Sequence, residues 1–164
     1  MIRKAIKEDI ERIMIIVNAA VLKMNQQGND QWGEDYPKEE DYLKDIEEDN
    51  LYVYCEDEEI QGVVCVNEDE AEEYGDIPWR RQGRALIIHR IAVNPESQGR
   101  GIAYKLLSFA DDLAMDKGIN YIKTDTYSLN KIAQNIFTRS GYIFRGIIHF
   151  QRRPEDFYRY DKEL

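Results

Sequence analysis

The stretch that decides the fold is IHRIAVNPESQGRGIAYKLLSFADDLA, residues 88–114. It joins an apolar run, typical of a strand buried on both faces, to a helix with apolar side chains at spacings of three and four. Two glycines, Gly99 and Gly101, fall in the predicted first turn of this helix, where glycine weakens helical structure. Unpaired backbone N–H groups and the positive end of the helix dipole lie at the same place. Glycines there would let an anion with several oxygens, such as a diphosphate, come close to those amides.

Other glycine-rich loops fit this stretch less well. A P-loop requires Lys-Ser or Lys-Thr directly after its second glycine, and Ile102 and Ala103 occupy that place. A Rossmann loop requires a third glycine within a run of parallel strands, whereas this loop follows the fourth strand of a largely antiparallel start. A merely flexible turn is also compatible with two glycines, so the motif needs support from the rest of the chain.

Apolar periodicity predicts the remaining elements. Apolar and polar residues alternate over residues 2–6, as in a strand, and an apolar stripe at helical spacing runs from Asp9 to Gly28. A short acidic helix that contains Tyr42 follows. Three strands are predicted by the runs LYVYC, IQGVVCV and ALIIHRIAV, and three more by NYIKTDTY, YIFRGIIHF and FYRY. Between NYIKTDTY and YIFRGIIHF, a helix is predicted that Asn130 caps and Gly141 ends. The order β-α-α-β-β-β-α-β-α-β-β predicts a mixed α/β sheet between helices, in a single domain over residues 1–164.

The composition limits the classes of binding partner that the protein can have. A formal net charge of −10 argues against a nucleic-acid binder, whose affinity comes from clustered Lys and Arg, and suits a cationic small molecule or a basic peptide better. No apolar run reaches membrane-spanning length and the N-terminus is charged from residue 3, so we expect a cytoplasmic protein without membrane contact. In the predicted hairpin Cys55 faces Ile60 and Cys65 is out of register, so no disulfide is expected. The two histidines and two cysteines lack metal-ligand spacing, and no metal is expected.

The segment IHRIAVNPESQGRGIAYKLL, together with LN at residues 129–130 and SGY at residues 140–142, resembles the Gcn5-related N-acetyltransferase (GNAT) family. The pyrophosphate loop of that family reads Gln or Arg, two residues, Gly, one residue, Gly or Ala, and Gln98, Gly101 and Ala103 meet it. The order of strands and helices is similar along nearly the whole chain. The resemblance implies a GNAT-like acyl-CoA N-acyltransferase fold. That fold has a central mixed, mostly antiparallel seven-stranded sheet, splayed between strands 4 and 5, with helices on both faces.

The resemblance also implies acetyl-CoA as co-substrate and a set of residues that hold it. Backbone amides of the loop would bind the diphosphate, and main-chain groups of the preceding strand would pair with the pantetheine arm. Asn130 and Phe137 would lie beside that arm, although Asn130 is equally well explained as a plain helix cap. The implied cofactor-binding residues are Ile91, Ala92, Val93, Gln98, Gly99, Arg100, Gly101, Ile102, Ala103, Asn130 and Phe137.

Acetyl transfer from a thioester to an amine requires a neutral amine, a donor for the developing oxyanion and a proton for the departing thiolate. The main-chain N–H of Ile91 or of a neighbour can serve as the donor. His89 is a candidate base, because imidazole titrates near neutral pH and strict alternation would place it on the face of Ile91 and Val93. The arylalkylamine N-acetyltransferases are similar in having a histidine at this place. A satisfied core histidine, with a water relay to a carboxylate, is the alternative, and His149 has a weaker claim.

The usual general acid of the family is missing. Many relatives carry a tyrosine at the position that Phe137 occupies in NKIAQNIFTRSGY, and a phenyl ring cannot donate a proton. Tyr127, Tyr104 or water would have to supply the proton from another direction. A thiolate whose thiol has a pKa of roughly 8.5, by analogy with cysteine, is a tolerable leaving group without strong acid catalysis.

Acceptor recognition is expected from aromatic and acidic residues in two loops, through cation–π and ionic contacts with an ammonium group. Core packing beneath these loops is an equal alternative for the two tryptophans. The sequence thus predicts an acetyl-CoA-dependent N-acetyltransferase for a small-molecule amine, acting in a ternary complex as a monomer or homodimer. Transfer to a protein or peptide amine and non-catalytic sensing of acetyl-CoA are the alternatives. The predicted acceptor-binding residues are Trp32, Glu34, Tyr36, Tyr74 and Trp79.

Overall fold

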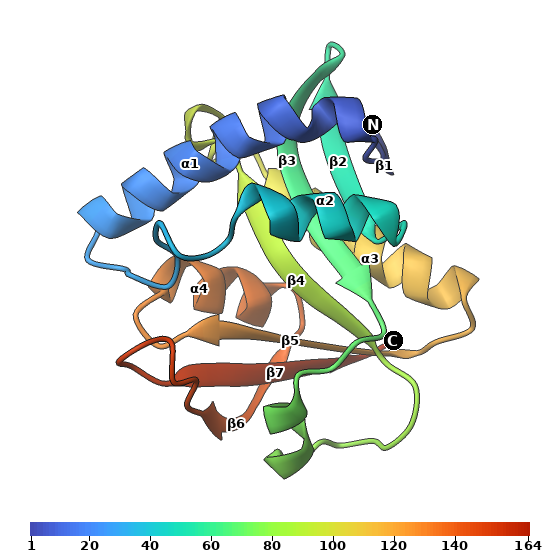
Figure 1. The fold of residues 1–164 in the computed structure, drawn as a ribbon. Helices are drawn as coiled ribbons and strands as arrows, with labels where there is room; N and C mark the ends of the chain where they lie inside the picture. Colours follow the sequence, from blue (N-terminus) through green and yellow to red (C-terminus); the bar gives the residue numbers. More distant parts are fainter.

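The computed structural model describes residues 1–164, and its seven strands form one sheet in the order β1-β2-β3-β4-β5-β7-β6 (Figure 1). Every neighbouring pair is antiparallel except β4 and β5, which run parallel. This arrangement and the order of the elements along the chain confirm the predicted fold class. The strands are β1 (Ile2–Lys4), β2 (Leu51–Glu56), β3 (Glu59–Asn67), β4 (Leu86–Val93), β5 (Tyr121–Tyr127), β6 (Ile143–Ile148) and β7 (Phe157–Glu163).

Two helices cover each face of the sheet (Figure 1). On one face, α1 turns apolar side chains at three-and-four spacing, Ile13, Ile16, Val17 and Ala20, toward β3 and β4. On the other face, α3 buries Leu106, among others, against the same strands. The helices are α1 (Ile10–Gln26), α2 (Glu39–Glu47), α3 (Ile102–Asp116) and α4 (Lys131–Arg139), with short 3-10 turns η1 (Lys7–Asp9), η2 (Glu72–Asp76) and η3 (Pro95–Ser97).

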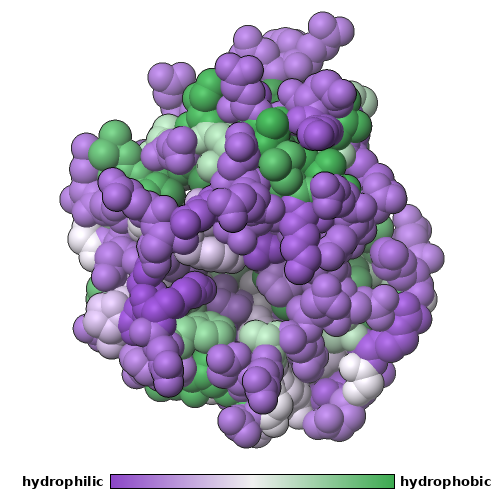
Figure 2. Space-filling model, viewed as in Figure 1, coloured by the Kyte–Doolittle hydropathy of each residue, from purple (hydrophilic) through white to green (hydrophobic).

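The surface is polar over most of the face seen in Figure 2, and apolar side chains gather chiefly over α1. In α1, Ile15 and Leu22 are seven residues apart and both are more than half exposed. None of the four helices combines the length and the apolar composition that crossing a lipid bilayer requires.

The β2–β3 hairpin has the predicted register. Cys55 lies opposite Ile60 and Cys65 lies opposite Leu51, and both thiols are free and buried. Burial raises the pKa of the Cys65 thiol to about 12, so this side chain is protonated at neutral pH.

The two glycines before α3 lie outside the helix, contrary to the prediction that they fall in its first turn. The backbone φ is +81° at Gly99 and +77° at Gly101, in the left-handed region that residues with a Cβ seldom adopt. A right-handed helix requires φ near −63°, so α3 can begin only at Ile102. The glycines therefore shape a turn that leads into the helix.

A bulge in β4 overturns the predicted alternation around His89. Val63 pairs with Ala92 and Cys65 with His89, so two steps along β3 span three along β4. Arg90 takes up the extra residue with φ of +46°. Ile91 then packs in the core on the α3 side, whereas Arg90 points to α2. His89 alternates with Ile88, which belongs to the α3 side, and therefore does not share a face with Ile91 and Val93.

Candidate active site

A gap opens in the middle of the sheet where β4 and β5 stop pairing. The two strands pair only at Leu86 with Ile122 and at Ile87 with Lys123, and Thr124 Oγ1 adds one hydrogen bond of 3.1 Å to the Ile88 carbonyl. Beyond that point β4 continues to Val93 without a strand on its β5 side. The splay predicted between strands 4 and 5 is confirmed, and it leaves a free strand edge facing the gap.

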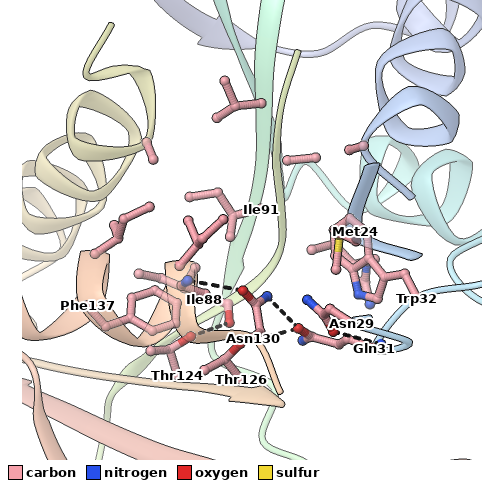
Figure 3. A pocket seen from close by; sticks show the side chains of 18 of the residues that line it. Met24, Asn29, Gln31, Trp32, Ile88, Ile91, Thr124, Thr126, Asn130 and Phe137 are labelled. Atoms are coloured by element: carbon pink, nitrogen blue, oxygen red, sulfur yellow. Dashed lines mark hydrogen bonds between the residues drawn. The ribbon is translucent and has the colours of Figure 1, made fainter. Parts of the chain in front are cut away.

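A cavity of about 820 Å³ fills this gap and reaches under the loop between α1 and α2 (Figure 3). It brings together ten of the eleven residues predicted to hold the cofactor. The remaining one, Arg100, points away and forms an ion pair of 2.5 Å with Glu56. The ten that line the cavity are Ile91, Ala92, Val93, Gln98, Gly99, Gly101, Ile102, Ala103, Asn130 and Phe137.

One end of the cavity is the turn before α3, which we call the glycine cradle, residues 98–103. A Cβ built on Gly99 or on Gly101 would meet no atom within 4 Å, so the space beside both backbones is open. A buried polar cluster fixes the chain just before the cradle. Gln61 Oε1 accepts hydrogen bonds of 2.9 Å from Asn94 Nδ2 and from Ser97 Oγ. The cradle is therefore held in shape by the sheet before any ligand arrives.

Lys23, on the last turns of α1, brings a positive charge to the glycine cradle. Its ammonium group donates a hydrogen bond of 2.6 Å to Gln98 Oε1, and the side chain lines the cavity. Two further N–H groups of the ammonium remain available for an anion.

Asn130 caps α4, as its position in the sequence predicts. Its Oδ1 accepts the Ala133 N–H at 3.1 Å, and its Nδ2 donates to Gln31 Oε1 at 2.7 Å (Figure 3). Thr126 Oγ1 donates to the same Gln31 oxygen at 3.3 Å. Gln31 comes from the α1–α2 loop, so this cluster joins the loop to the β5–α4 side across the cavity.

Phe137 lies on the apolar wall of the cavity with Ile132 and Ile136 of the same helix. Its ring packs against Tyr142 and Tyr160 at centroid distances of 5.6 and 5.8 Å. The side chain thus anchors α4 to the sheet while presenting carbon atoms to the gap.

His89 lines the cavity with a defined tautomer. Its Nε2 lies 2.8 Å from Asn67 Oδ1, and that oxygen also accepts the Asp69 N–H at 3.0 Å. Since a carbonyl oxygen only accepts, neutral His89 carries its proton on Nε2 and a lone pair on Nδ1. Burial and the neighbouring Arg90 charge lower the pKa of His89, with Asp125 and Asp45 opposing them in part. The imidazole is therefore neutral at pH 7.

Arg90, the bulge residue, is clamped beneath the cavity. It forms two hydrogen bonds to Asp45 of α2, at 2.7 and 2.6 Å, and donates a third of 2.9 Å to the Tyr36 hydroxyl. The carboxylate of Asp45 is almost fully buried, so this bidentate pair is an interior ion pair. The ion pair explains how the strained φ of Arg90 is maintained, and the hydrogen bond from Arg90 orients the Tyr36 ring.

Asp125, on β5, also lines the cavity, and its carboxylate is paired as well. Its Oδ2 accepts the Tyr74 hydroxyl at 2.6 Å and lies 2.8 Å from Arg159 Nη1. The Arg159 guanidinium is fully buried between the rings of Tyr74 and Phe150, with centroid distances of 4.5 and 4.8 Å.

Two loops flank the end of the cavity opposite the glycine cradle, which we call the acceptor end. Arg153 donates to both carboxylate oxygens of Asp35 at 2.7 and 2.8 Å and to the Gln31 carbonyl at 2.8 Å. The α1–α2 loop, which includes Trp32 and Tyr36, is thereby fastened to the β6–β7 loop. Both aromatic side chains line the cavity, as does Tyr74.

Several predicted residues lie outside the cavity. The Tyr127 ring is buried against Phe157, and its hydroxyl accepts the Glu155 N–H at 3.1 Å, so its role as acid is not supported. Trp79 packs on Tyr74 beneath the cavity, as the packing alternative predicted. Glu34 and His149 also lie outside the cavity, and the His149 imidazole is half exposed, 3.5 Å from Asp156.

Sequence reasoning missed many polar residues of the cavity, among them Lys23, Gln31, Asp125 and Arg152. None of these four belongs to a local motif, and all four lie more than 20 residues from the glycine cradle in the sequence. One signal was available: Arg152 and Arg153 are adjacent cations in a strongly acidic chain, separated from Phe150 by one residue.

The chain matches known acetyltransferases. The profile described as acetyltransferase (GNAT) family matches residues 2–142. The uncharacterized N-acetyltransferase YesJ of Bacillus subtilis (strain 168) is 25% identical over 154 residues, which cover 87% of this chain and 81% of that protein. The crystal structure of a GNAT-family acetyltransferase from Streptococcus agalactiae 2603 has a TM-score of 0.88 at 28% identity, with 100% and 95% of the two chains covered.

A further solved structure carries a ligand. It is yncA of Salmonella typhimurium, described as a putative acetyltransferase with its cofactor acetyl-CoA, with a TM-score of 0.72 at 20% identity and coverage of 100% and 93%. This likeness shows a shared fold.

Proposed function

The chain belongs to the acetyltransferase (GNAT) family and is an acyltransferase, and on that premise we propose that it transfers acetyl from acetyl-CoA to a primary amine of a small molecule. Both substrates would be bound together, and the amine would attack directly. One observation carries the proposal: the cavity runs without a break from the glycine cradle, through the gap between β4 and β5, to the aromatic acceptor end.

The residues at the first end fit acetyl-CoA. The open space beside Gly99 and Gly101 admits a diphosphate to the backbone amides at the N-terminus of α3. The free edge of β4 at residues 91–93 offers N–H and C=O groups to an amide-bearing arm, as a neighbouring strand would. Ile132, Ile136 and Phe137 supply the apolar wall. When bound, acetyl-CoA would supply an activated acetyl group as a thioester.

His89 is the proposed base. It lines the cavity, it is neutral at pH 7, and its Nδ1 lone pair is free to accept a proton directly or through water. The bulge at Arg90 turns this imidazole away from the face of Ile91 and Val93, so a water relay from the amine fits the geometry better than direct contact. The N–H groups of Ile91 and Val93, which alternate away from β3 onto the open strand edge, are the proposed oxyanion donors.

The proposed proton donor for the leaving thiolate is Tyr104 or water. Phe137 has no hydroxyl group and Tyr127 lies outside the cavity, whereas Tyr104 lines it in the first turn of α3. A small acceptor is favoured over a protein chain, because the bonds from Arg153 to Asp35 and to Gln31 hold two loops together beside the acceptor end.

The test is an acceptor screen that follows free CoA thiol on the purified protein. Acetyl transfer predicts thiol release with at least one primary amine and an equal amount of N-acetyl product. Tight binding of acetyl-CoA with no thiol release from any amine would favour the non-catalytic sensor instead.

A further inference from the structure

The cavity is basic although the chain is strongly acidic. Asp125 is the only acidic side chain among the residues that line it, and the basic ones are Lys23, Arg90 and Arg152. The formal net charge of the whole chain is −10. The charge of the cavity is thus opposite to that of the protein, and it must be explained by what the cavity binds.

Most of these charges already have partners within the chain. Arg90 pairs with Asp45, Asp125 pairs with Arg159, and each pair is neutral as a unit. Lys23 lies at the glycine cradle, where the diphosphate of the co-substrate accounts for it. The neighbouring Arg153 is paired with Asp35.

Arg152 is the exception. Its side chain makes no ion pair and no hydrogen bond within the chain, and it lines the acceptor end. Its guanidinium lies over three aromatic rings, 4.4 Å from the centroid of Tyr36, 5.3 Å from that of Phe150 and 5.4 Å from that of Phe157. Stacking fixes the plane of the group while leaving its N–H edges free.

The position of this guanidinium is tied to the proposed base. The Tyr36 hydroxyl is held by Arg90, which follows His89 in the chain. The free cation and the imidazole therefore lie at the same end of the cavity. A planar guanidinium with free N–H edges suits a carboxylate, which it can bind through two parallel hydrogen bonds.

Apolar side chains form much of the wall at the acceptor end, beside its polar groups. Trp32 and Met24 line it on one side and Phe150 lines it on the other. No carboxylate without a partner is present to receive a second positive charge on the acceptor, because Glu34 lies outside the cavity and Asp35 is paired. The sequence-based expectation of a purely cationic acceptor held by these carboxylates is therefore not supported.

Resting on the proposed function, we propose that the acceptor is an amine that also carries a carboxylate on an apolar body, and that Arg152 binds this carboxylate. The chemical class is that of amino acids with apolar or aromatic side chains. Arg152 is then the residue that determines specificity between such acids and the corresponding simple amines.

The experiment compares matched acceptors that differ only at the carboxylate. L-phenylalanine, L-phenylalaninamide and 2-phenylethylamine form one set, and L-leucine, L-leucinamide and 3-methylbutylamine form another. Steady-state release of CoA thiol gives kcat and KM for each, and calorimetric titration gives the affinity of each acid and amide for the protein. The wild type is expected to favour the acids over both neutral partners by about tenfold or more in KM, as hydrogen bonds between charged groups are strong.

Three variants assign the preference to Arg152. Arg152→Gln is expected to raise KM for the acids about tenfold while leaving KM for the amides nearly unchanged. Arg152→Lys keeps the charge but loses the planar fork, so a partial loss is expected. Arg139→Gln, an exposed arginine on the last turn of α4 that makes no ion pair, is the matched control for the change in net charge.

The outcomes separate this inference from the proposed function. Amides or simple amines preferred over acids by the wild type, or equal losses for acids and amides in Arg152→Gln, would overturn the inference while acetyl transfer stands. If no amine led to thiol release, the proposed acetyl transfer would be refuted. In that case, acids that bind the wild type but not Arg152→Gln in the calorimeter would still support carboxylate binding, and equal binding to both would refute it.

Discussion

The two ends of the cavity are built in different ways. The glycine cradle is continuous backbone, residues 98–103, shaped by two left-handed glycines and offering amide groups with few side chains. The acceptor end is assembled from side chains of five separate segments, which are α1 with its following loop, the β3–β4 connection, β4, β5 and the β6–β7 loop. Its polar groups are mostly neutralised in pairs, with Arg152 left free.

This difference reflects what each end binds. A diphosphate is the same in every molecule of acetyl-CoA, so a rigid backbone turn suffices and no side chain needs to be chosen for it. An acceptor must be distinguished from other amines, and side chains supply the charge and shape that do so. The following predictions test this division of roles, in order of decreasing effect.

Gly101→Trp should abolish acetyl-CoA binding. The new side chain would fill the open space beside the cradle, and a residue with a Cβ is strained at φ of +77°. Calorimetric titration with CoA checks this.

Gly118→Trp is the matched control. Gly118 also has a left-handed φ, of +69°, with open space around it, but it follows α3 at the far end from the cavity. It should lose similar stability and keep full affinity for CoA. Equal affinity in both variants would contradict the cradle assignment.

Asp45→Ala should destabilise the fold by about 3 kcal/mol, because it leaves the Arg90 guanidinium largely buried without a partner. Chemical denaturation measures the change. Glu68→Ala removes a partner from the exposed pair with Arg84 and should cost less than about 1 kcal/mol. Where the Asp45 variant remains folded, KM should rise for the acceptor, through Tyr36, and not for acetyl-CoA. A rise for both substrates would show that the two ends are not independent.

His89→Gln should lower kcat/KM about a hundredfold, as expected for loss of a general base. Burial lowers the pKa of His89 below its ordinary 6.5, so wild-type activity should fall as the pH drops through that lowered pKa. The variant should lack this acidic limb, and a profile with the limb intact would exclude His89 as the base.

The same pKa shift predicts how stability depends on pH. The unfolded chain protonates His89 near pH 6.5, whereas the folded chain does so only at lower pH, so wild-type stability should decline as the pH falls below 6.5. Denaturation of the wild type and of His89→Gln at several pH values should show a smaller decline in the variant, and an equal decline in both would contradict the lowered pKa.

Lys23→Gln should have the smallest effect, a two- to fivefold weaker affinity for acetyl-CoA that diminishes with added salt, as for exposed charges. Lys44→Gln on α2, an exposed lysine remote from the cradle, is the control. A loss of affinity as large as that of Gly101→Trp would show that the Lys23 side chain, and not the backbone, is the main contact of the anion.

The same division explains what the sequence could predict. The cradle is one local motif, so Gln98, Gly101 and Ala103 pointed to it directly, and the apolar periodicities predicted every strand and helix in order. The β2–β3 register followed from the length of the turn. Local chemistry decides these features, and a single stretch of chain contains it.

The acceptor end could not be predicted, because its geometry depends on contacts between distant residues. The bulge at Arg90 is stabilised by Asp45, which lies 45 positions earlier, and no local pattern shows it. Strict alternation therefore placed His89 on the wrong face. Tyr127 failed for a similar reason, since its hydroxyl is engaged by the backbone of the β6–β7 loop rather than by the cavity.

The crystal structure of the protein with acetyl-CoA tests the central claim most directly. The diphosphate should lie against the backbone amides of residues 99–103, and the pantetheine arm should run along residues 91–93 of β4, with the two strands still apart. Ligand bound elsewhere, or a cradle left empty with β4 and β5 paired along their full length, would contradict the account.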